Sequence, residues 1–199
     1  GQYIGESVTK ISAGDLNNDG CIDLATASPD SITVYHGNSL LDFEFIDSID
    51  SFSELNNVKI MDMEGNGNKE VIYSQNLTAM ETGDIDGDYD LDIIISEADG
   101  INRVFINNGD SYYENSSLDL GAGNASVIRV TDLDQDCRPE IIFGRDGDID
   151  TIYENDGNGN FYPLSLNTGT VHTKDITVND YDNDGWDDLL IASGDDEAN

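Results

Sequence analysis

The chain has 199 residues, which suits one domain with a hydrophobic core, although only 37% of the residues are hydrophobic. Its 42 acidic residues outnumber 8 basic residues and give a net charge of −34. A chain of this charge repels the phosphates of nucleic acids and anionic lipids, so we exclude nucleic acid as a partner.

Apolar runs in the sequence are short. The longest, such as Leu189–Ala192, fall far below the ~18 apolar residues of a membrane span, so we expect no membrane insertion. The chain begins Gly1-Gln2-Tyr3 without a basic and apolar leader, which we interpret as a mature form or a fragment. Asn76, Asn115 and Asn124 each begin an Asn-x-Ser/Thr sequence, and each alone is weak evidence for a glycan.

The acidic residues recur in five nine-residue segments that align without gaps. Each segment carries an oxygen-bearing side chain at positions 1, 3, 5 and 9. We number these segments loops 1 to 5, and they span residues 15–23, 62–70, 84–92, 132–140 and 180–188. Because five segments share one pattern, the sequence predicts a repeat architecture.

Loop 1 is followed by three strand-like segments. Leu24–Ala27 comes directly after the loop, Ile32–Tyr35 follows as a third element, and Phe43–Phe45 marks a fourth, aromatic one. Short apolar runs rich in β-branched and aromatic residues are typical of buried strands.

The second repeat is shorter. Val58–Ile60 precedes loop 2 and Val71–Tyr73 follows it, and Gln75–Leu77 then leads directly into the next repeat. Loops 2 and 3 begin 22 residues apart, whereas loops 1 and 2 begin 47 apart and loops 3, 4 and 5 begin 48 apart. The shortfall predicts that strands three and four are missing from this repeat.

Repeats 3 and 4 again have four expected strands each. Val127–Val130 precedes loop 4 as an alternating apolar stretch, and the runs after loops 3 and 4 are Ile93–Ile95 and Ile141–Phe143. Third elements are expected at Arg103–Ile106 and Thr151–Tyr153. The fourth lie around Tyr112 and Tyr113, and around Phe161 and Tyr162. A four-stranded unit of 47 or 48 residues is typical of a propeller blade.

The fifth repeat stops after its second strand, Leu189–Ile191, with Gly194–Asn199 behind it. The sequence therefore predicts an all-β fold: one β-propeller domain over residues 1–199, with about five blades and a calcium loop between strands 1 and 2 of each. Blades 2 and 5 are incomplete in this prediction. The expected repeats are approximately 7–54, 55–77, 78–124, 125–170 and 171–199.

The spacing of oxygen side chains in the loops predicts about five calcium ions, one per loop. Calcium takes six to eight oxygen ligands, and alternate carboxylates point inward when the backbone curls tightly. Position 7 varies freely, so we expect it to offer its backbone carbonyl, and the position-9 acid closes the shell. The predicted ligands are Asp15, Asn17, Asp19, Cys21 and Asp23; Asp62, Glu64, Asn66, Asn68 and Glu70; Asp84, Asp86, Asp88, Asp90 and Asp92; Asp132, Asp134, Asp136, Arg138 and Glu140; and Asp180, Asp182, Asp184, Trp186 and Asp188.

Other readings of the loops fit less well. An EF-hand or a dockerin repeat closes its site with position 12, which here is Thr26, Tyr73, Ile95, Phe143 and Ile191. Magnesium prefers to keep several waters. A metal-free Asx-rich turn stays open as the alternative, most of all for loop 2 with its fewer acids.

The Asp-x-Asp/Asn-x-Asp-Gly-x-x-Asp core followed by a Leu/Ile strand resembles the FG-GAP/VCBS class of calcium-binding propeller repeats, known from integrin α-subunit heads and many secreted proteins. The resemblance covers nearly the whole chain. The Phe-Gly and Gly-Ala-Pro signatures of the integrin version are not legible, so the VCBS-like branch fits better. The resemblance implies a calcium-stabilised propeller in adhesion, glycan binding or assembly, and it names no ligand.

The remaining chemistry-bearing residues give no catalytic pattern. His36 and His172 lie in no triad-like context, and Trp186 is expected to pack within its loop rather than serve as a sugar platform. Cys21 and Cys137 lie in different blades, so we expect two unpaired thiols, with an intermolecular bond as the alternative.

The leading functional hypothesis is a non-enzymatic, extracellular module, secreted or on the cell surface. It would act in structure or adhesion with other protein chains as partners, and could self-assemble into a surface fibre. The alternative is a calcium-dependent lectin that binds surface glycans through Tyr112, Tyr113, Phe161 and Tyr162. A polysaccharide lyase is less favoured, because the 8 Lys and Arg residues form no basic cluster. The outer strands of blades 2 and 5 are either absent from this sequence or supplied by neighbouring chains, and in the second case the unpaired strand edges would be templates for another chain.

Overall fold

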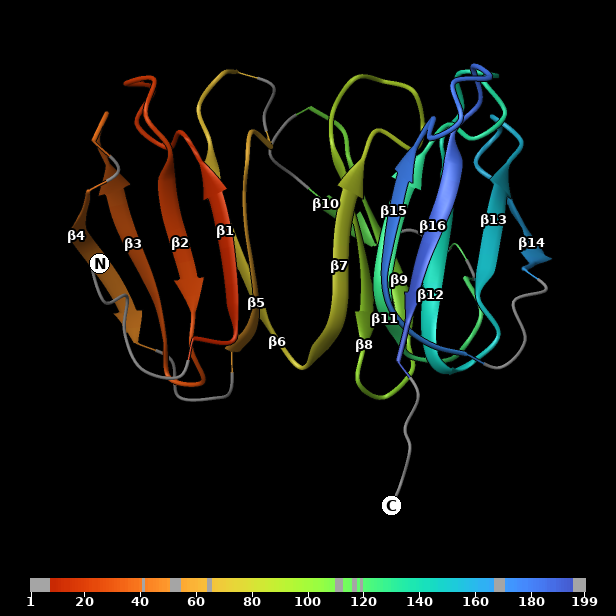
Figure 1. Ribbon diagram of the computed structural model, residues 1–199, viewed down its shortest axis with the longest axis horizontal. Helices are drawn as coiled ribbons and strands as arrows, with labels where there is room; N and C mark the ends of the chain where they lie inside the picture. Colours follow the sequence, from red (N-terminus) through yellow and green to blue (C-terminus); the bar gives the residue numbers. More distant parts are fainter. Residues whose placement is uncertain are drawn as a thin grey trace. The chain divides into compact units, whose positions relative to one another are not determined.

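In the computed structural model, the described part of the chain contains sixteen β-strands and no helix (Figure 1). That part covers residues 8–40, 42–50, 55–63, 66–109, 113–115, 118, 120–166 and 171–194. The chain forms two compact units, Gly1–Leu77 and Thr78–Asn199, which we call unit 1 and unit 2. The prediction of an all-β fold is confirmed.

Unit 1 contains repeats 1 and 2. Repeat 1 forms a four-stranded antiparallel sheet in chain order, and repeat 2 forms a two-stranded ribbon. The sheet strands are β1 (Lys10–Gly14), β2 (Asp23–Ala27), β3 (Ser31–Gly37) and β4 (Phe43–Asp50), and those of the ribbon are β5 (Leu55–Met61) and β6 (Glu70–Gln75). Buried Ala25, Ala27 and Ile32 of the sheet pack with Leu55 and Val58 of β5.

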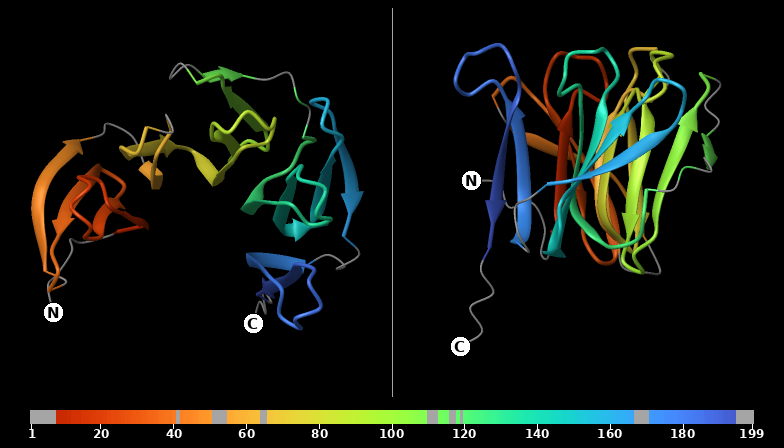
Figure 2. Two further views of the ribbon diagram at one scale, coloured as in Figure 1. Left: turned by 90° about the horizontal axis from the view of Figure 1, so that it is seen from above. Right: turned by 90° about the vertical axis from the view of Figure 1, so that its right-hand side faces the viewer.

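Unit 2 contains repeats 3, 4 and 5. Repeat 3 is a four-stranded sheet made of β7 (Leu77–Gly83), β8 (Asp92–Glu97), β9 (Asn102–Asn107) and β10 (Tyr113–Asn115). The strands of repeat 4 are β11 (Ala125–Thr131), β12 (Glu140–Asp148), β13 (Thr151–Asn155) and β14 (Phe161–Ser165), and those of repeat 5 are β15 (Val171–Asn179) and β16 (Asp188–Ser193). Two further views show the same strands (Figure 2).

Strand β12 joins repeats 4 and 5. Its first part pairs with β11 and β13, and its last residues pair with the start of β15, at Asp146↔His172 and Asp148↔Val171. His172 Nδ1 and Lys174 Nζ lie 2.5 and 2.7 Å from the two oxygens of Asp146. These hydrogen bonds hold the pKa of Asp146 below its usual range.

The strands expected on both sides of each loop are present. In the described residues, repeats 2 and 5 have two strands each, and the short spacing between loops 2 and 3 predicted this for repeat 2. The closed propeller and the single domain with its repeat limits stay predictions. Asn76 lies exposed in the turn between β6 and β7, and Cys21 and Cys137 are both free.

Candidate metal-binding loops

The first acid of every loop closes the turn by accepting backbone hydrogen bonds. In loop 4, Asp132 Oδ1 accepts from the N–H of Asp136 at 3.0 Å, and Oδ2 accepts from the N–H of Cys137 at 2.9 Å. The first acids of the other four loops accept the same two bonds from positions 5 and 6. These bonds are local to nine residues, which is why the sequence pattern was enough to locate the loops.

The last acid of every loop joins the loop to its second strand. One of its oxygens accepts the N–H of position 2, at 2.7 to 3.1 Å in the five loops. In repeats 1 and 3 the other oxygen accepts an N–H from the end of the third strand, at Gly37 and Asn107. Asp23 and Asp92 are fully buried, and their two oxygens bond to the loop and to the third strand.

Position 6 of every loop adopts a left-handed backbone. Glycine occupies it in three loops, where Gly20, Gly67 and Gly185 have φ between 83° and 91°. Tyr89 and Cys137 hold the same position in loops 3 and 4, with φ of 75° and 66°. A side chain in this region costs of order 1–2 kcal/mol, so loops 3 and 4 carry strain that the glycine loops do not.

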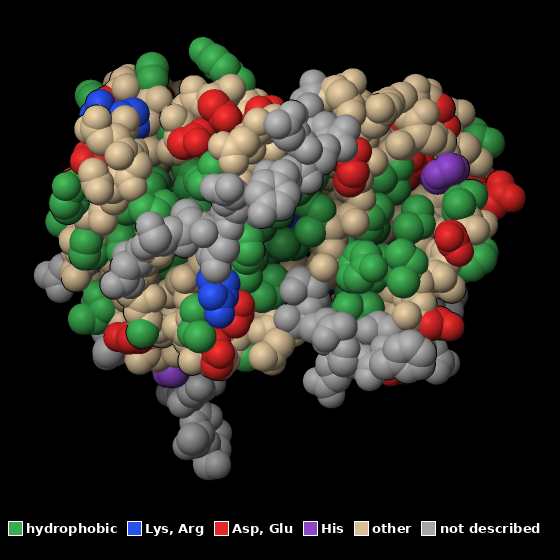
Figure 3. Space-filling model, turned by 180° about the vertical axis from the view of Figure 1, so that it is seen from behind, with side chains coloured by type: hydrophobic (Ala, Val, Ile, Leu, Met, Phe, Trp, Pro, Cys, Tyr) green, Lys and Arg blue, Asp and Glu red, His purple; other side chains and the backbone are tan. Residues whose placement is uncertain are grey.

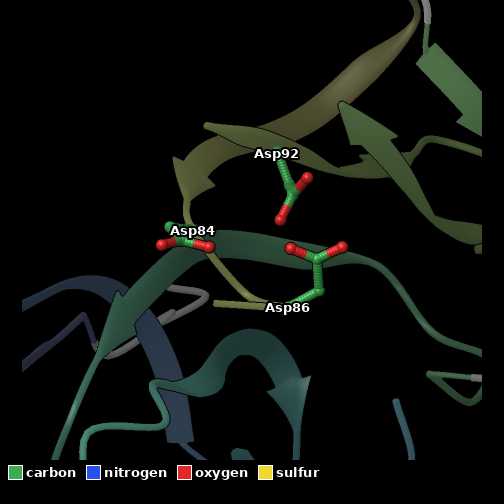
Figure 4. Close-up of side chains that lie close together, drawn as sticks. All are labelled: Asp84, Asp86 and Asp92. Atoms are coloured by element: carbon green, nitrogen blue, oxygen red, sulfur yellow. The ribbon is translucent and has the colours of Figure 1, made fainter. Parts of the chain in front are cut away.

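Carboxylates converge in loops 3, 4 and 5. Within each group, oxygen atoms of three acids lie within 4.8 Å of one another. The groups are Asp84, Asp86 and Asp92; Asp132, Asp134 and Asp136; and Asp180, Asp182 and Asp188. Figure 4 shows the first group, in which the three carboxylates point toward a common space. Each of these clusters could hold a metal ion.

Loops 1 and 2 differ from the other three. In the part of the chain that the structure describes, neither holds such a group of three acids. Loop 1 has Asn17 at position 3, and its amide donates to Asp19 at 3.0 Å. Loop 2 has Asn66 at position 5, and its predicted ligand Glu64 lies outside the described residues. Among the described residues, the acid triads therefore all lie in unit 2.

Burial and like charge raise the pKa of several loop acids. Burial raises the pKa of Asp92 to about 6, and the charges of Asp86 and Asp88 add to the shift. The pKa of Glu140 and that of Asp86 are also raised, again mainly by burial and then by neighbouring acids. The carboxylates thus repel one another where they converge, and a bound cation would reverse this effect.

The position-7 residues share a backbone contact and differ in their side chains. Their N–H groups donate to the side chain at position 5, at 2.7 to 2.9 Å in all five loops. Arg138 forms an ion pair with Asp136. Trp186, expected to pack within its loop, leaves 52% of its surface exposed. That these residues offer a backbone carbonyl to a metal stays a prediction.

Contacts between neighbouring loops were not expected from the sequence. Asn18 Nδ2 donates to Asn68 Oδ1 at 3.2 Å, which joins loop 1 to loop 2. Gln135 Nε2 donates to the carbonyl of Gly185, which joins loop 4 to loop 5. Asn18 and Gln135 occupy the same position 4 and both have positive φ. The side-chain amide at position 4 is the one sequence feature that could have indicated these contacts. Its partner lies about fifty residues away, so the sequence does not identify it.

The family of the chain follows from a comparison with family models. A model described as FG-GAP-like repeat matches residues 84–143 and again residues 132–191. Each match spans two consecutive loops with the strands between them, and together they cover more than half of the chain. No curated protein matches the sequence significantly. The repeated loops, the strands that follow them and these two matches agree, and the chain belongs to the family of FG-GAP-like repeat proteins.

Proposed function

We propose that the chain is an extracellular, calcium-stabilised interaction module without enzymatic activity. The observation that carries this proposal is the convergence of three acids in each of loops 3, 4 and 5, within one loop geometry repeated five times. FG-GAP repeats suggest an interaction or adhesion-type module and typically occur in extracellular proteins. No described helix is long and apolar enough to cross a membrane.

The donor set of the loops fits calcium. All predicted side-chain ligands are hard oxygen donors, and calcium is the cation that takes six to eight of them in a flexible shell. In loop 5, Asp180, Asp182 and Asp188 already share one space, and Asp184 lies two residues from Asp182. The same positions in each of the other loops would hold one ion, with the position-7 carbonyl completing the shell.

The ion would supply positive charge where the chain has gathered negative charge. The first and last acids of each loop already tie the first strand to the second through backbone N–H groups. A cation between them would remove the repulsion that opposes this arrangement. The loops would then stiffen the strand pairs that present the surface of the module.

Calcium titration of the chelator-treated protein by calorimetry tests this proposal. We expect about five sites, with the tightest in loops 3, 4 and 5, where the triads lie. The variant Asp180→Ala should lose one site, and Asp146→Ala, an acid outside the loops, should lose none. Absence of calcium binding by the folded chain would contradict the proposal.

Partners of the proposed module are other protein chains. The face in Figure 3 carries hydrophobic side chains between many acidic ones, with few Lys or Arg side chains. Exposed apolar residues include Phe45, Ile46 and Ile49 on the edge strand β4. Apolar surface at a strand edge is suited to contacts with another protein and gives no catalytic group.

Glycan binding is a second candidate, which exposed aromatic residues in the loops favour. Tyr89 in loop 3 is 92% exposed, and Trp186 in loop 5 is half exposed. Among the residues first expected to bind sugars, Tyr162 is exposed, whereas Tyr112 and the side chain of Tyr113 lie outside the described residues. A glycan array read with and without calcium, with Tyr89→Ser and Trp186→Ser as variants, separates a lectin from a protein-binding module.

A further inference from the structure

Position 4 of each loop lies between the predicted ligands at positions 3 and 5, and in two loops its side chain reaches the next loop. In loop 4 this residue is Gln135, whose Nε2 donates to the carbonyl of Gly185 in loop 5. In loop 1 it is Asn18, whose Nδ2 donates to Asn68 Oδ1 in loop 2 at 3.2 Å. One loop position therefore makes the same kind of link in each unit.

The bond from Gln135 ends on a peptide group that also holds a predicted ligand of loop 5. The carbonyl of Gly185 accepts this bond. The N–H on the other side of the same peptide bond, that of Trp186, donates to Asp184 Oδ1 at 2.9 Å. In loop 4, the peptide N–H that follows Gln135 donates to Asp132 Oδ1 at 3.0 Å. Backbone groups and one side chain thus connect a predicted ligand of loop 4 to a predicted ligand of loop 5.

The strands behind loops 4 and 5 hold the two loops side by side. The last residues of β12 pair with the start of β15, and buried Ile142 and Ile176 of these strands share one core. Arg129 Nε of β11 donates to the carbonyl of Ile176 at 2.7 Å. Because the strands are fixed in this way, a change in the backbone of one loop reaches the other through Gln135.

Like charge opposes the closed form of both loops. Oxygen atoms of three acids converge in each loop, and without a cation they repel one another. The bond from Gln135 joins the backbones of the two loops, so it forms best when both are closed. An ion that closes one loop therefore lowers the free-energy cost of closing the other.

We infer that loops 4 and 5 bind calcium cooperatively, and that Gln135 is the residue that couples them. This inference rests on the proposed function and adds to it a regulation of the same sites. Coupling of this kind is reciprocal, so each ion should raise the affinity of the other loop by the same factor. One neutral hydrogen bond corresponds to a factor of about two to ten.

Loop 3 lacks such a link. Its position 4 is Gly87, which has no side chain that could reach a neighbouring loop. Loop 3 should therefore bind its ion without coupling through this position, whereas loops 1 and 2 should be coupled through Asn18.

Trp186 provides a probe of loop 5 alone. It is the single tryptophan of the chain, it occupies position 7 of loop 5, and its N–H contacts Asp184. Calcium titration of the full chain, followed by tryptophan fluorescence, measures the affinity of this loop. Gln135→Ala and Asp132→Ala should each weaken it about two- to tenfold. The double variant should bind no more weakly than Asp132→Ala alone, because both changes break the same link.

Two controls separate this coupling from a general loss of stability. Asn18→Ala changes the same loop position in unit 1, also at positive φ, and should leave the affinity of loop 5 unchanged. Asp84→Ala empties loop 3 of the same unit, and should weaken loop 5 less than Asp132→Ala does. Melting temperatures in calcium verify that every variant folds.

The inference and the proposed function can fail separately. Calcium binding with the same loop 5 affinity in the unchanged chain and in Gln135→Ala would overturn the inference alone. An equal weakening by Asp84→Ala and Asp132→Ala would also overturn it, because the effect would then not depend on Gln135. Absence of calcium binding in calorimetry would overturn the proposed function as well.

Discussion

Removal of calcium should destabilise unit 2 more than unit 1. A ligand that binds the native state alone adds ~2.7 kcal/mol per site at a hundredfold excess over Kd. Three triads in loops 3, 4 and 5 would therefore add about 8 kcal/mol to unit 2. A domain has a total stability of about 5–15 kcal/mol, so chelation should remove most of it.

Hydrogen exchange resolves the two units in one experiment. Amides of β12 report on unit 2, and amides of β2 report on unit 1. With EDTA, we expect the β12 amides to exchange much faster. The melting temperature of unit 2 should fall by about 20 °C or more. The β2 amides should respond less, because loop 1 lacks the acid triad. Equal protection of β12 with and without EDTA, or an equal loss of protection in both units, would contradict this prediction.

Three further predictions concern single residues. Asp84→Ala should abolish one calcium site in a calorimetric titration and loosen its repeat, whereas Asp62→Ala in the acid-poor loop 2 should cost less; equal losses would contradict this ranking. The pKa of Asp92 is raised to about 6, so its contribution to metal-free stability is full below its ordinary value of 3.8 and is lost as pH rises through about 6. The melting temperature of the metal-free protein should therefore rise when the pH is lowered from 7 to 5. The rise should be smaller in Asp92→Asn. Arg129→Ala removes ion pairs to Glu81 and Asp175 and a hydrogen bond to the carbonyl of Ile176. It should lower the free energy of unfolding, measured by urea titration, by ~1–3 kcal/mol. The conservative variant Arg129→Lys should lose less.

Periodicity determined most of the secondary structure. Every loop is closed by bonds among nine consecutive residues, and every following strand is a short apolar run, so both are local properties. The two-stranded form of repeat 2 could be predicted from loop spacing alone. The family could be predicted for the same reason, since its pattern lies within the loop and the strand behind it.

Contacts between distant residues could not be predicted in this way. From the sequence, loop 1 was as good a candidate as loops 3, 4 and 5, and only the tertiary structure showed that the described acids converge in threes in unit 2 and not in unit 1. The same is true of the second pairing of β12 and of the bond from Gln135 to loop 5. Each depends on which repeat packs beside another, and such packing joins residues more than twenty positions apart, beyond the reach of any local pattern.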